Sequence, residues 1–116
     1  MFDLIIAGGR DFNDFELLKR RVDHIVGGKP VFNLICGMAR GADMLGYRWA
    51  KERGTNIIRC PAHWDLYGKK AGYNRNVEMA MISTHLIAFW DGQSKGTAHM
   101  IEIAKLNKLE FRIIRY

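Results

Sequence analysis

Four short segments carry most of the residues in this sequence that could do chemistry. Each follows an apolar run; the four are GGRDF at 8–12, GMARGAD at 37–43, the 61–73 loop with the NRN of 74–76, and DGQSKGT at 91–97. Glycine lets backbone N–H groups approach a ligand closely, and a helix N-terminus adds unpaired donors and a partial positive charge. Because they stand before predicted helices, two pairs of glycines predict phosphate-binding turns: Gly37 with Gly41, and Gly92 with Gly96.

The side chains of these segments suit an anionic ligand that contains a ring. Six of the 18 basic residues fall here, namely Arg10, Arg40, Lys69, Lys70, Arg75 and Lys95. Arg40 and Arg75 could each clamp a phosphate through two parallel hydrogen bonds. Asp11 or Asp43 could accept a hydrogen bond from a ribose hydroxyl. Flat faces for a base are offered by Trp64, Tyr67, Tyr73 and Trp90.

Several of these residues also have a purely structural explanation. Glycines are common at strand-to-helix turns for geometric reasons, and Asp43 could cap the helix that follows it. Tyr73 and Trp90 could pack in the core or in a dimer contact. His63 and His99 stand alone in the sequence, which favours structural or solvent-facing positions over metal ligation. The coincidence of four such segments on one predicted edge favours a binding site.

The elements that must position these segments alternate strictly between strand and helix. Apolar runs predict strands at 2–8, 31–36, 55–60, 84–90 and 109–116, and helical spacing predicts helices at 13–26, 42–53, 74–83 and 97–107. Asn13 with Glu16 fits a capping box for the first helix, and Asn74 fits a cap for the third. The strands are apolar on both sides, as in parallel sheets covered by helices. The chain is therefore expected to form one α/β domain over 1–116, a doubly wound parallel sheet of about five strands with helices on both faces.

In such a sheet, ligands bind beyond the carboxyl ends of the strands, near the point where strand order reverses. The four polar segments all fall at that edge. The loop at 61–73 is long for this kind of fold, and long loops in small domains usually have a functional role.

Composition limits the class of protein further. The chain has 116 residues with 48% hydrophobic content, enough for a core, and a net charge of +6, which suits an anionic partner. Cys36 and Cys60 have neither CxxC spacing nor partnered histidines, so we expect buried thiols in a reducing cytosol. No apolar run reaches the roughly 18 residues of a membrane span, and 2–8 resembles a strand rather than a signal peptide. We therefore expect a cytoplasmic protein without membrane contact.

Two common nucleotide-binding motifs are absent. The P-loop pattern requires Gly-Lys followed by Ser or Thr, whereas here Gly96 separates Lys95 from Thr97. The dinucleotide pattern GxGxxG lacks its third glycine in GGRDFN. A P-loop nucleoside triphosphatase or an NAD-dependent dehydrogenase is therefore not expected.

Four segments, in their order along the chain, resemble the small YspA-type proteins of the SLOG superfamily: GGRDF, GMARGAD, PAHWDLYGKKAGYNRN and FWDGQSKGT. That superfamily includes the cytokinin-activating LOG enzymes and the DNA-processing protein A domain. The resemblance implies a Rossmann-like fold that binds a nucleotide or nucleotide-derived ligand, often a signal in conflict between bacteria and phages, with no metal and no cofactor. By position it points to Gly8, Gly9, Arg10, Gly37, Arg40, Gly41, Asp43, Arg75, Asn76, Asp91, Gly92, Ser94, Lys95, Gly96 and Thr97.

The sequence departs from the LOG enzymes at the residue that does their chemistry. Those phosphoribohydrolases carry PGGxGTxxE, whose glutamate assists cleavage of the N-glycosidic bond. Here Met100 stands where the glutamate is expected, and Glu102 lies two positions further, roughly on another helix face. Three residues remain candidates for acid–base chemistry, although none of them stands at the position of the motif's glutamate: Asp91, Glu102 and Asp43.

Three functions therefore remain open. The leading one is binding of a nucleotide or an ADP-ribose-like ligand, as a signal sensor or a sequestering protein. The alternative is a hydrolase that cuts an N-glycosidic or phosphoester bond of a nucleotide, and the sequence leaves open whether the chain turns a substrate over. Nucleic-acid binding is the least expected, because no helix is dense in basic residues beyond the KRR at 19–21. A homo-oligomer is expected, with Tyr47, Trp49, Met79 and Met81 as candidate contacts.

Overall fold

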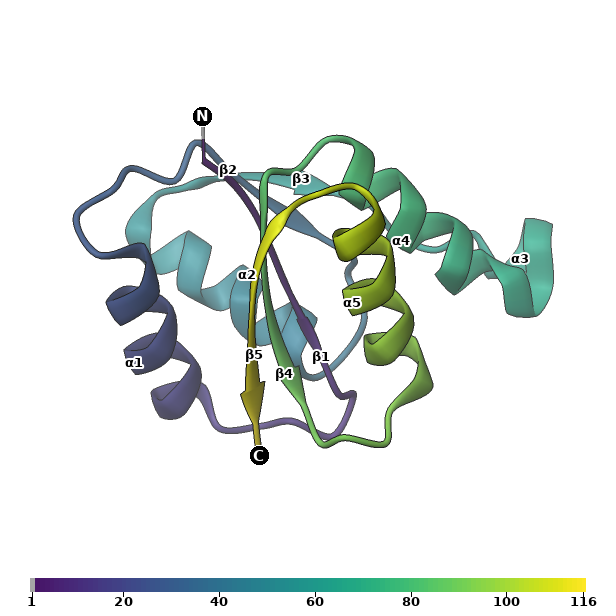
Figure 1. Ribbon diagram of the computed structural model, residues 1–116, viewed down its shortest axis with the longest axis horizontal. Helices are drawn as coiled ribbons and strands as arrows, with labels where there is room; N and C mark the ends of the chain where they lie inside the picture. Colours follow the sequence, from purple (N-terminus) through teal and green to yellow (C-terminus); the bar gives the residue numbers. More distant parts are fainter. Residues whose placement is uncertain (1) are drawn as a thin grey trace.

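The computed structural model describes residues 2–116, and over these residues the chain forms one five-stranded parallel sheet in the order β3-β2-β1-β4-β5 (Figure 1). The strands are β1 (Asp3–Gly8), β2 (Asn33–Cys36), β3 (Asn56–Arg59), β4 (His85–Trp90) and β5 (Glu110–Arg115). The helices are α1 (Phe15–Val26), α2 (Ala42–Arg53), α3 (Trp64–Tyr67), α4 (Ala71–Met81) and α5 (Lys95–Leu106), with a short 3-10 turn η1 at Gly68–Lys70.

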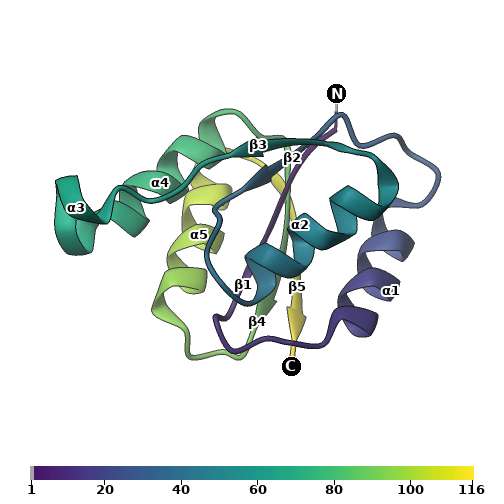
Figure 2. The ribbon, with the colours of Figure 1, turned by 180° about the vertical axis from the view of Figure 1, so that it is seen from behind.

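Helices cover both faces of the sheet. The chain runs outward from β1 to β3, then returns to the other side of β1 for β4 and β5. Because each parallel crossover is right-handed, this reversal places α1 and α2 on one face and α4 and α5 on the other (Figures 1 and 2). The predicted α/β, Rossmann-like, doubly wound fold is confirmed.

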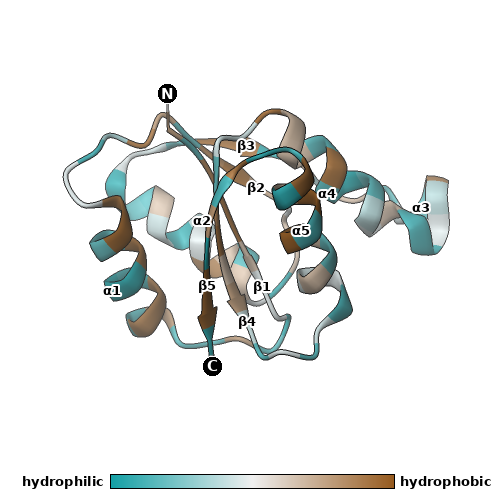
Figure 3. Ribbon diagram, in the orientation of Figure 1, coloured by the Kyte–Doolittle hydropathy of each residue, from teal (hydrophilic) through white to brown (hydrophobic). Residues whose placement is uncertain are grey.

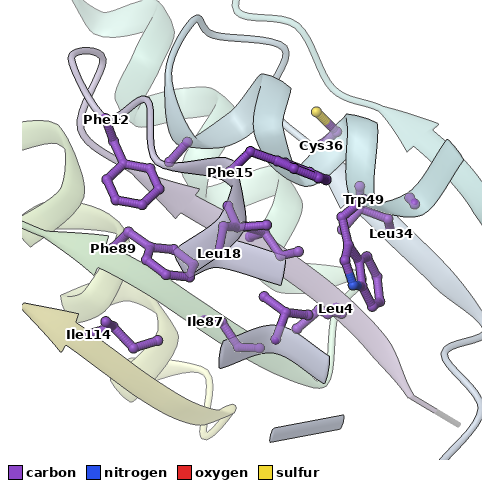
Figure 4. Packing of buried hydrophobic residues seen from close by; sticks show 14 of the residues in the cluster. Leu4, Phe12, Phe15, Leu18, Leu34, Cys36, Trp49, Ile87, Phe89 and Ile114 are labelled. Carbon is purple, nitrogen blue, oxygen red and sulfur yellow. The ribbon is translucent and has the colours of Figure 1, made fainter. Parts of the chain in front are cut away.

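The sheet separates two apolar layers. Alternate residues of β1 enter opposite layers: Leu4 and Ile6 join the cluster beneath α1 and α2, which Figure 4 shows, while Ile5 and Ala7 join the cluster beneath α4 and α5. Successive side chains of a strand point to opposite faces, so a strand covered on both sides must be apolar at every position. This explains the continuous apolar run of residues 4–7, and Figure 3 shows the hydrophobic colour of the central strands.

The starts of α1 and α5 differ from the predicted ones. Asp14, not Asn13, caps α1, because its Oδ1 accepts a hydrogen bond from the Leu17 N–H at 3.0 Å. Ser94 caps α5, which therefore begins at Lys95 rather than at residue 97. In the first case two adjacent residues can both cap a helix, and the backbone conformation decides between them.

The segment 61–73, predicted as a loop, is mostly helical. It contains α3, η1 and the first turn of α4, so α4 begins at Ala71 and Asn74 lies inside the helix instead of capping it. Figures 1 and 2 both show α3 projecting at the edge of the molecule, away from α1. No residue of α3 is buried.

Some side chains lie elsewhere than expected. Trp49 and Met79 are 1% and 2% exposed, so the expectation that they form an oligomer contact is wrong. Cys36 is buried as predicted, whereas Cys60 is only partly buried.

Within residues 2–116, no helix is both long enough and apolar enough to span a bilayer.

Candidate functional site

A cleft of about 840 Å³ opens at the carboxyl ends of the strands. One wall comes from the end of β1 and the start of α2, and the other comes from α3, α4 and α5. Because β1 and β4 are neighbours that lead to opposite faces of the sheet, the cleft lies at the point where strand order reverses. This is the edge at which open α/β sheets bind ligands.

Most of the predicted binding residues line this cleft: Gly8, Gly9, Arg10, Arg40, Asp43, Arg75, Asn76, Ser94, Gly96 and Thr97. Gly37 lines an adjoining hollow of about 520 Å³, which shares Arg10, Arg40 and Arg75 with the cleft. The structure therefore brings three arginines from separate segments to one place. It places Gly41, Asp91, Gly92, Lys95 and Glu102 outside the lining.

Gly41 joins the two arginine-bearing loops without lining the cleft. Its φ is +83°, and a Cβ at this position would collide with the carbonyl oxygen of Gly9. The neighbouring Ala42 N–H donates a hydrogen bond to that same Gly9 oxygen at 3.1 Å. Glycine is needed here both for the positive φ and for the close approach, so this contact holds the loop of Arg10 against the loop of Arg40.

Arg75 reaches from α4 to the end of β2. Its Nη1 donates to the carbonyl oxygen of Gly37, and its Nε donates to Oδ1 of Asn76 at 3.2 Å. A Cβ on Gly37 would stand 2.9 Å from this Nη1 and 2.7 Å from Oδ2 of Asp43. Gly37 therefore leaves room for a cation and a carboxylate beside the backbone.

Asp43 is a buried carboxylate in the cleft wall, only 6% exposed. Its Oδ2 accepts a hydrogen bond from the Ala39 N–H at 3.2 Å, which ties the loop before α2 to the helix. Burial raises the pKa of Asp43 from 3.8 to about 6, while the charges of Arg75 and Arg10 and the Ala39 hydrogen bond oppose the shift. Among residues 2–116, no cationic nitrogen forms a salt bridge with this carboxylate.

Asp43→Asn is expected to make the protein more stable at pH 7.5 and to leave stability unchanged at pH 4. The folded state binds more protons than the unfolded state between the ordinary pKa of 3.8 and the folded value of about 6. Wild-type stability therefore falls as pH rises through this window, and the loss is complete above it. Asparagine carries no charge, so the variant avoids a loss of about 3 kcal/mol. Urea unfolding of wild type and Asp43→Asn at both pH values measures the difference in their free energies of unfolding. The same difference at pH 4 and pH 7.5 would contradict the prediction.

Two of the four candidate aromatic residues line the cleft. The Arg10 guanidinium lies 5.8 Å from the centre of the Trp64 ring, and Tyr73 lies beside His99 with ring centres 4.4 Å apart. Tyr67 lies outside the lining. Trp90 has a structural position, because its Nε1 donates to the Ser94 carbonyl oxygen at 3.0 Å. Trp64 and Tyr73 remain as surfaces on which a ring could stack.

The segment 91–97 contributes less than expected. Asp91 accepts hydrogen bonds from the N–H groups of Ser94 and Gln93, both at 2.8 Å, and these bonds lower its pKa. A Cβ on Gly92 would collide with the guanidinium of Arg115. Asp91 and Gly92 thus shape the turn that starts α5. Lys95 and Glu102 are exposed on α5, so of the three acid–base candidates the cleft contains Asp43 alone.

Sequence reasoning missed the apolar part of the cleft. Met79 and Met100 line its inner end, although Met79 was expected at an oligomer contact. Helical spacing could have indicated both, since Met79 follows Arg75 by four residues and Met100 follows Thr97 by three, which places each pair on one helix face. In the described part of the chain, no group of three or more His, Cys, Asp or Glu residues could hold a metal ion.

Comparisons with known proteins agree with this architecture. Gene 61 protein of Mycobacterium phage D29 is 38% identical over an alignment of 78 residues, and the match covers 62% of this chain and 62% of the phage protein. The chain thus matches about three fifths of that relative's length. DNA processing protein A from Streptococcus pneumoniae shares the fold, with a TM-score of 0.76 at 16% identity over 99% of this chain and 50% of that protein.

A family model matches residues 2–67, which contain β1, β2, β3 and the first two of the four polar segments. This match takes in more than half of the chain. It includes the GGRDF and GMARGAD turns, whose contact at Gly41 brings Arg10 and Arg40 to the cleft. The chain therefore belongs to the YspA, cpYpsA-related SLOG family.

Proposed function

We propose that the cleft binds a nucleotide or a nucleotide-derived ligand such as an ADP-ribose-like molecule. The observation that carries this proposal is the convergence of Arg10, Arg40 and Arg75, from three separate segments, on one cleft at the switch point of the sheet. Guanidinium groups bind phosphate through paired, charge-assisted hydrogen bonds. Lys69 adds a fourth positive charge to the same lining.

The cleft has two chemically different ends. Arg10, Arg40 and Lys69 are exposed and line the outer part, while Met79 and Met100 are buried and line the inner part. Small-molecule sites commonly measure about 300–1,000 Å³ and combine apolar walls with a few placed polar groups. A molecule with phosphate at one end and a flat ring at the other matches this division.

Asp43 gives the proposed ligand a third point of attachment. Its carboxylate is buried in the cleft wall, and its Oδ2 accepts one hydrogen bond, from Ala39. A buried acceptor is most stable when its bonding capacity is filled. A ribose hydroxyl between the phosphate end and the ring end would supply the missing donor.

Isothermal titration calorimetry with AMP, ADP, ATP, ADP-ribose and cyclic mononucleotides tests the proposal. We expect at least one of them to bind with a Kd in the micromolar range, and Arg10→Ala to weaken that binding. Arg20→Ala is the matched control, because Arg20 is an exposed arginine of α1 outside the cleft. No binding by any of these compounds at millimolar concentration would overturn the proposal.

Hydrolysis of the bound nucleotide is a second candidate, and Asp43 is the observation that favours it. A carboxyl group in a cleft with a pKa raised to about 6 can hold or release a proton near neutral pH. Chromatography would detect release of base or ribose phosphate, and Asp43→Asn should abolish the release. Binding without turnover would leave the sensor or sequestering role.

The proposal also includes a cellular setting, a bacterial or phage-infected cytoplasm. Cys36 and Cys60 are free thiols, which fits the reducing cytoplasm, and the similarity to a phage protein fits a part in conflict between bacteria and phages. A homo-oligomer remains part of the proposal. Met81, which is 72% exposed, and the partly exposed Tyr47 are the remaining contact candidates.

A further inference from the structure

The Arg75 guanidinium is fixed in direction by hydrogen bonds on two of its nitrogens. Nη1 donates to the Gly37 carbonyl oxygen, which comes from the end of β2, and Nε donates to Oδ1 of Asn76 at 3.2 Å. Among residues 2–116, Nη2 has no hydrogen-bond partner. A ligand phosphate at Nη2 would therefore meet a guanidinium whose plane is set by Gly37 and Asn76.

The amide of Asn76 is fully used inside the protein. The side chain is 6% exposed, and its Nδ2 lies 3.4 Å from the Gly96 carbonyl oxygen and 3.1 Å from Nδ1 of His99. An asparagine amide has two N–H donors, so both go to these partners while Oδ1 accepts from Arg75. Exchanging the amide O and N would set donor against donor at Arg75 and oxygen against oxygen at Gly96. The orientation of Asn76 is therefore fixed.

This orientation decides the tautomer of His99. Because Asn76 donates to Nδ1, that nitrogen must be the acceptor, and the ring proton must lie on Nε2. A second proton, on Nδ1, would set N–H against N–H. Burial lowers the pKa of His99, and the charge of Glu102 on the same helix opposes this shift. Tyr73, from α4, packs against the His99 ring.

We propose that Asn76 and His99 are positioning residues for Arg75, and that His99 supports this position only as the neutral imidazole. When His99 gains its second proton, the Asn76 amide must turn away from it, and Nε of Arg75 loses its acceptor. Asn76 then acts on a ligand through Arg75 rather than by touching it. The importance of this arrangement for binding rests on the proposed function, but the hydrogen-bond chain itself does not.

Nitrogen-15 NMR without any ligand tests the chain of hydrogen bonds directly. Between pH 5 and pH 8, the Nε–H resonance of Arg75 is expected to shift with the same midpoint as the His99 ring nitrogens. Asn76→Ala should remove this response, while His24→Gln, a change at an exposed histidine of α1, should leave it intact. An Arg75 resonance that stays constant while His99 titrates would overturn the proposal.

Binding of inorganic pyrophosphate, the probe for the phosphate end, supplies the second readout. His99→Gln keeps an acceptor for Asn76 but has no proton to gain, so its affinity is the reference at each pH. Comparison at equal pH cancels the titration of pyrophosphate and of Asp43. As pH falls below the His99 midpoint, wild-type affinity should drop about threefold to tenfold relative to His99→Gln. Asn76→Ala should bind weakly at every pH.

The two readouts separate the inference from the proposed function. If Arg75 follows the His99 titration but pyrophosphate does not bind, the positioning holds and the phosphate site is wrong. If pyrophosphate binds equally well to wild type and to Asn76→Ala, the positioning is wrong and the proposed site stands. Should a variant fail to fold, the wild-type NMR titration alone decides the matter.

Discussion

Arg40→Ala is expected to weaken nucleotide binding by about 10- to 100-fold, whereas Lys95→Ala should change it by less than about twofold. A hydrogen bond to a charged group contributes roughly 1.5–3 kcal/mol, and each 1.4 kcal/mol is about tenfold in Kd. Arg40 is exposed and lines both the cleft and the adjoining hollow. Lys95 is also exposed and cationic, but it lies outside both.

Calorimetry with the best-binding compound measures both variants. Arg40→Lys separates charge from shape, because lysine keeps the positive charge but lacks the planar fork of the guanidinium. An intermediate loss is expected for it. Equal losses in Arg40→Ala and Lys95→Ala would show that binding follows the net charge of the protein rather than this cleft.

Trp49→Ala is expected to lower the free energy of unfolding by about 3–5 kcal/mol, the range for truncating a buried aromatic side chain. Trp49 is 1% exposed and lies in the cluster beneath α1 and α2 (Figure 4). Its Nε1 donates to Oδ1 of Asp23 at 2.8 Å, which joins α2 to α1. Since small domains have only about 5–15 kcal/mol of total stability, this single change should bring the protein close to unfolding.

Trp64→Ala is the matched control for this loss. The Trp64 side chain is 49% exposed on α3, so its removal should alter stability by less than about 0.5 kcal/mol. Urea denaturation followed by circular dichroism measures both variants without relying on tryptophan fluorescence. A loss in Trp64→Ala as large as in Trp49→Ala would mean that α3 is packed far more tightly than its exposure indicates.

The fold was predictable because its strands and helices have strong patterns. Residues 4–7 are apolar without interruption, which indicates a strand covered on both sides, and helical spacing marks α1 clearly. Strict alternation then allows few topologies, since parallel crossovers are right-handed. One failure is at the start of α1, where Asn13 and Asp14 are both good capping residues and Asp14 is the one that caps the helix. The α3 segment has no buried face, so no apolar period could reveal it.

The site was predictable at the level of segments and only partly at the level of side chains. Topology places the ends of β1, β2 and β4 together, and with them Arg10 and Arg40. The direction of a side chain depends on its rotation about a helix: Thr97 is buried in the cleft wall while Lys95, two residues earlier, is exposed outside it. The hydrogen bond between Asn76 on α4 and His99 on α5 joins residues that are 23 positions apart in the chain. No local sequence pattern indicates such a contact.

The central position of β1 affects how the chain acquires its structure during synthesis. β1 leaves the ribosome before the other four strands, yet one of its edges pairs with β4, and the hydrogen bond between Asp3 and Thr84 spans 81 residues. Until residues 85–90 emerge, that edge offers unpaired backbone groups on an apolar strand, which is a template for joining other chains. Contacts so distant in sequence also form slowly. Chains that terminate before β4 should therefore aggregate, and nascent chains should depend on chaperones until β4 is made.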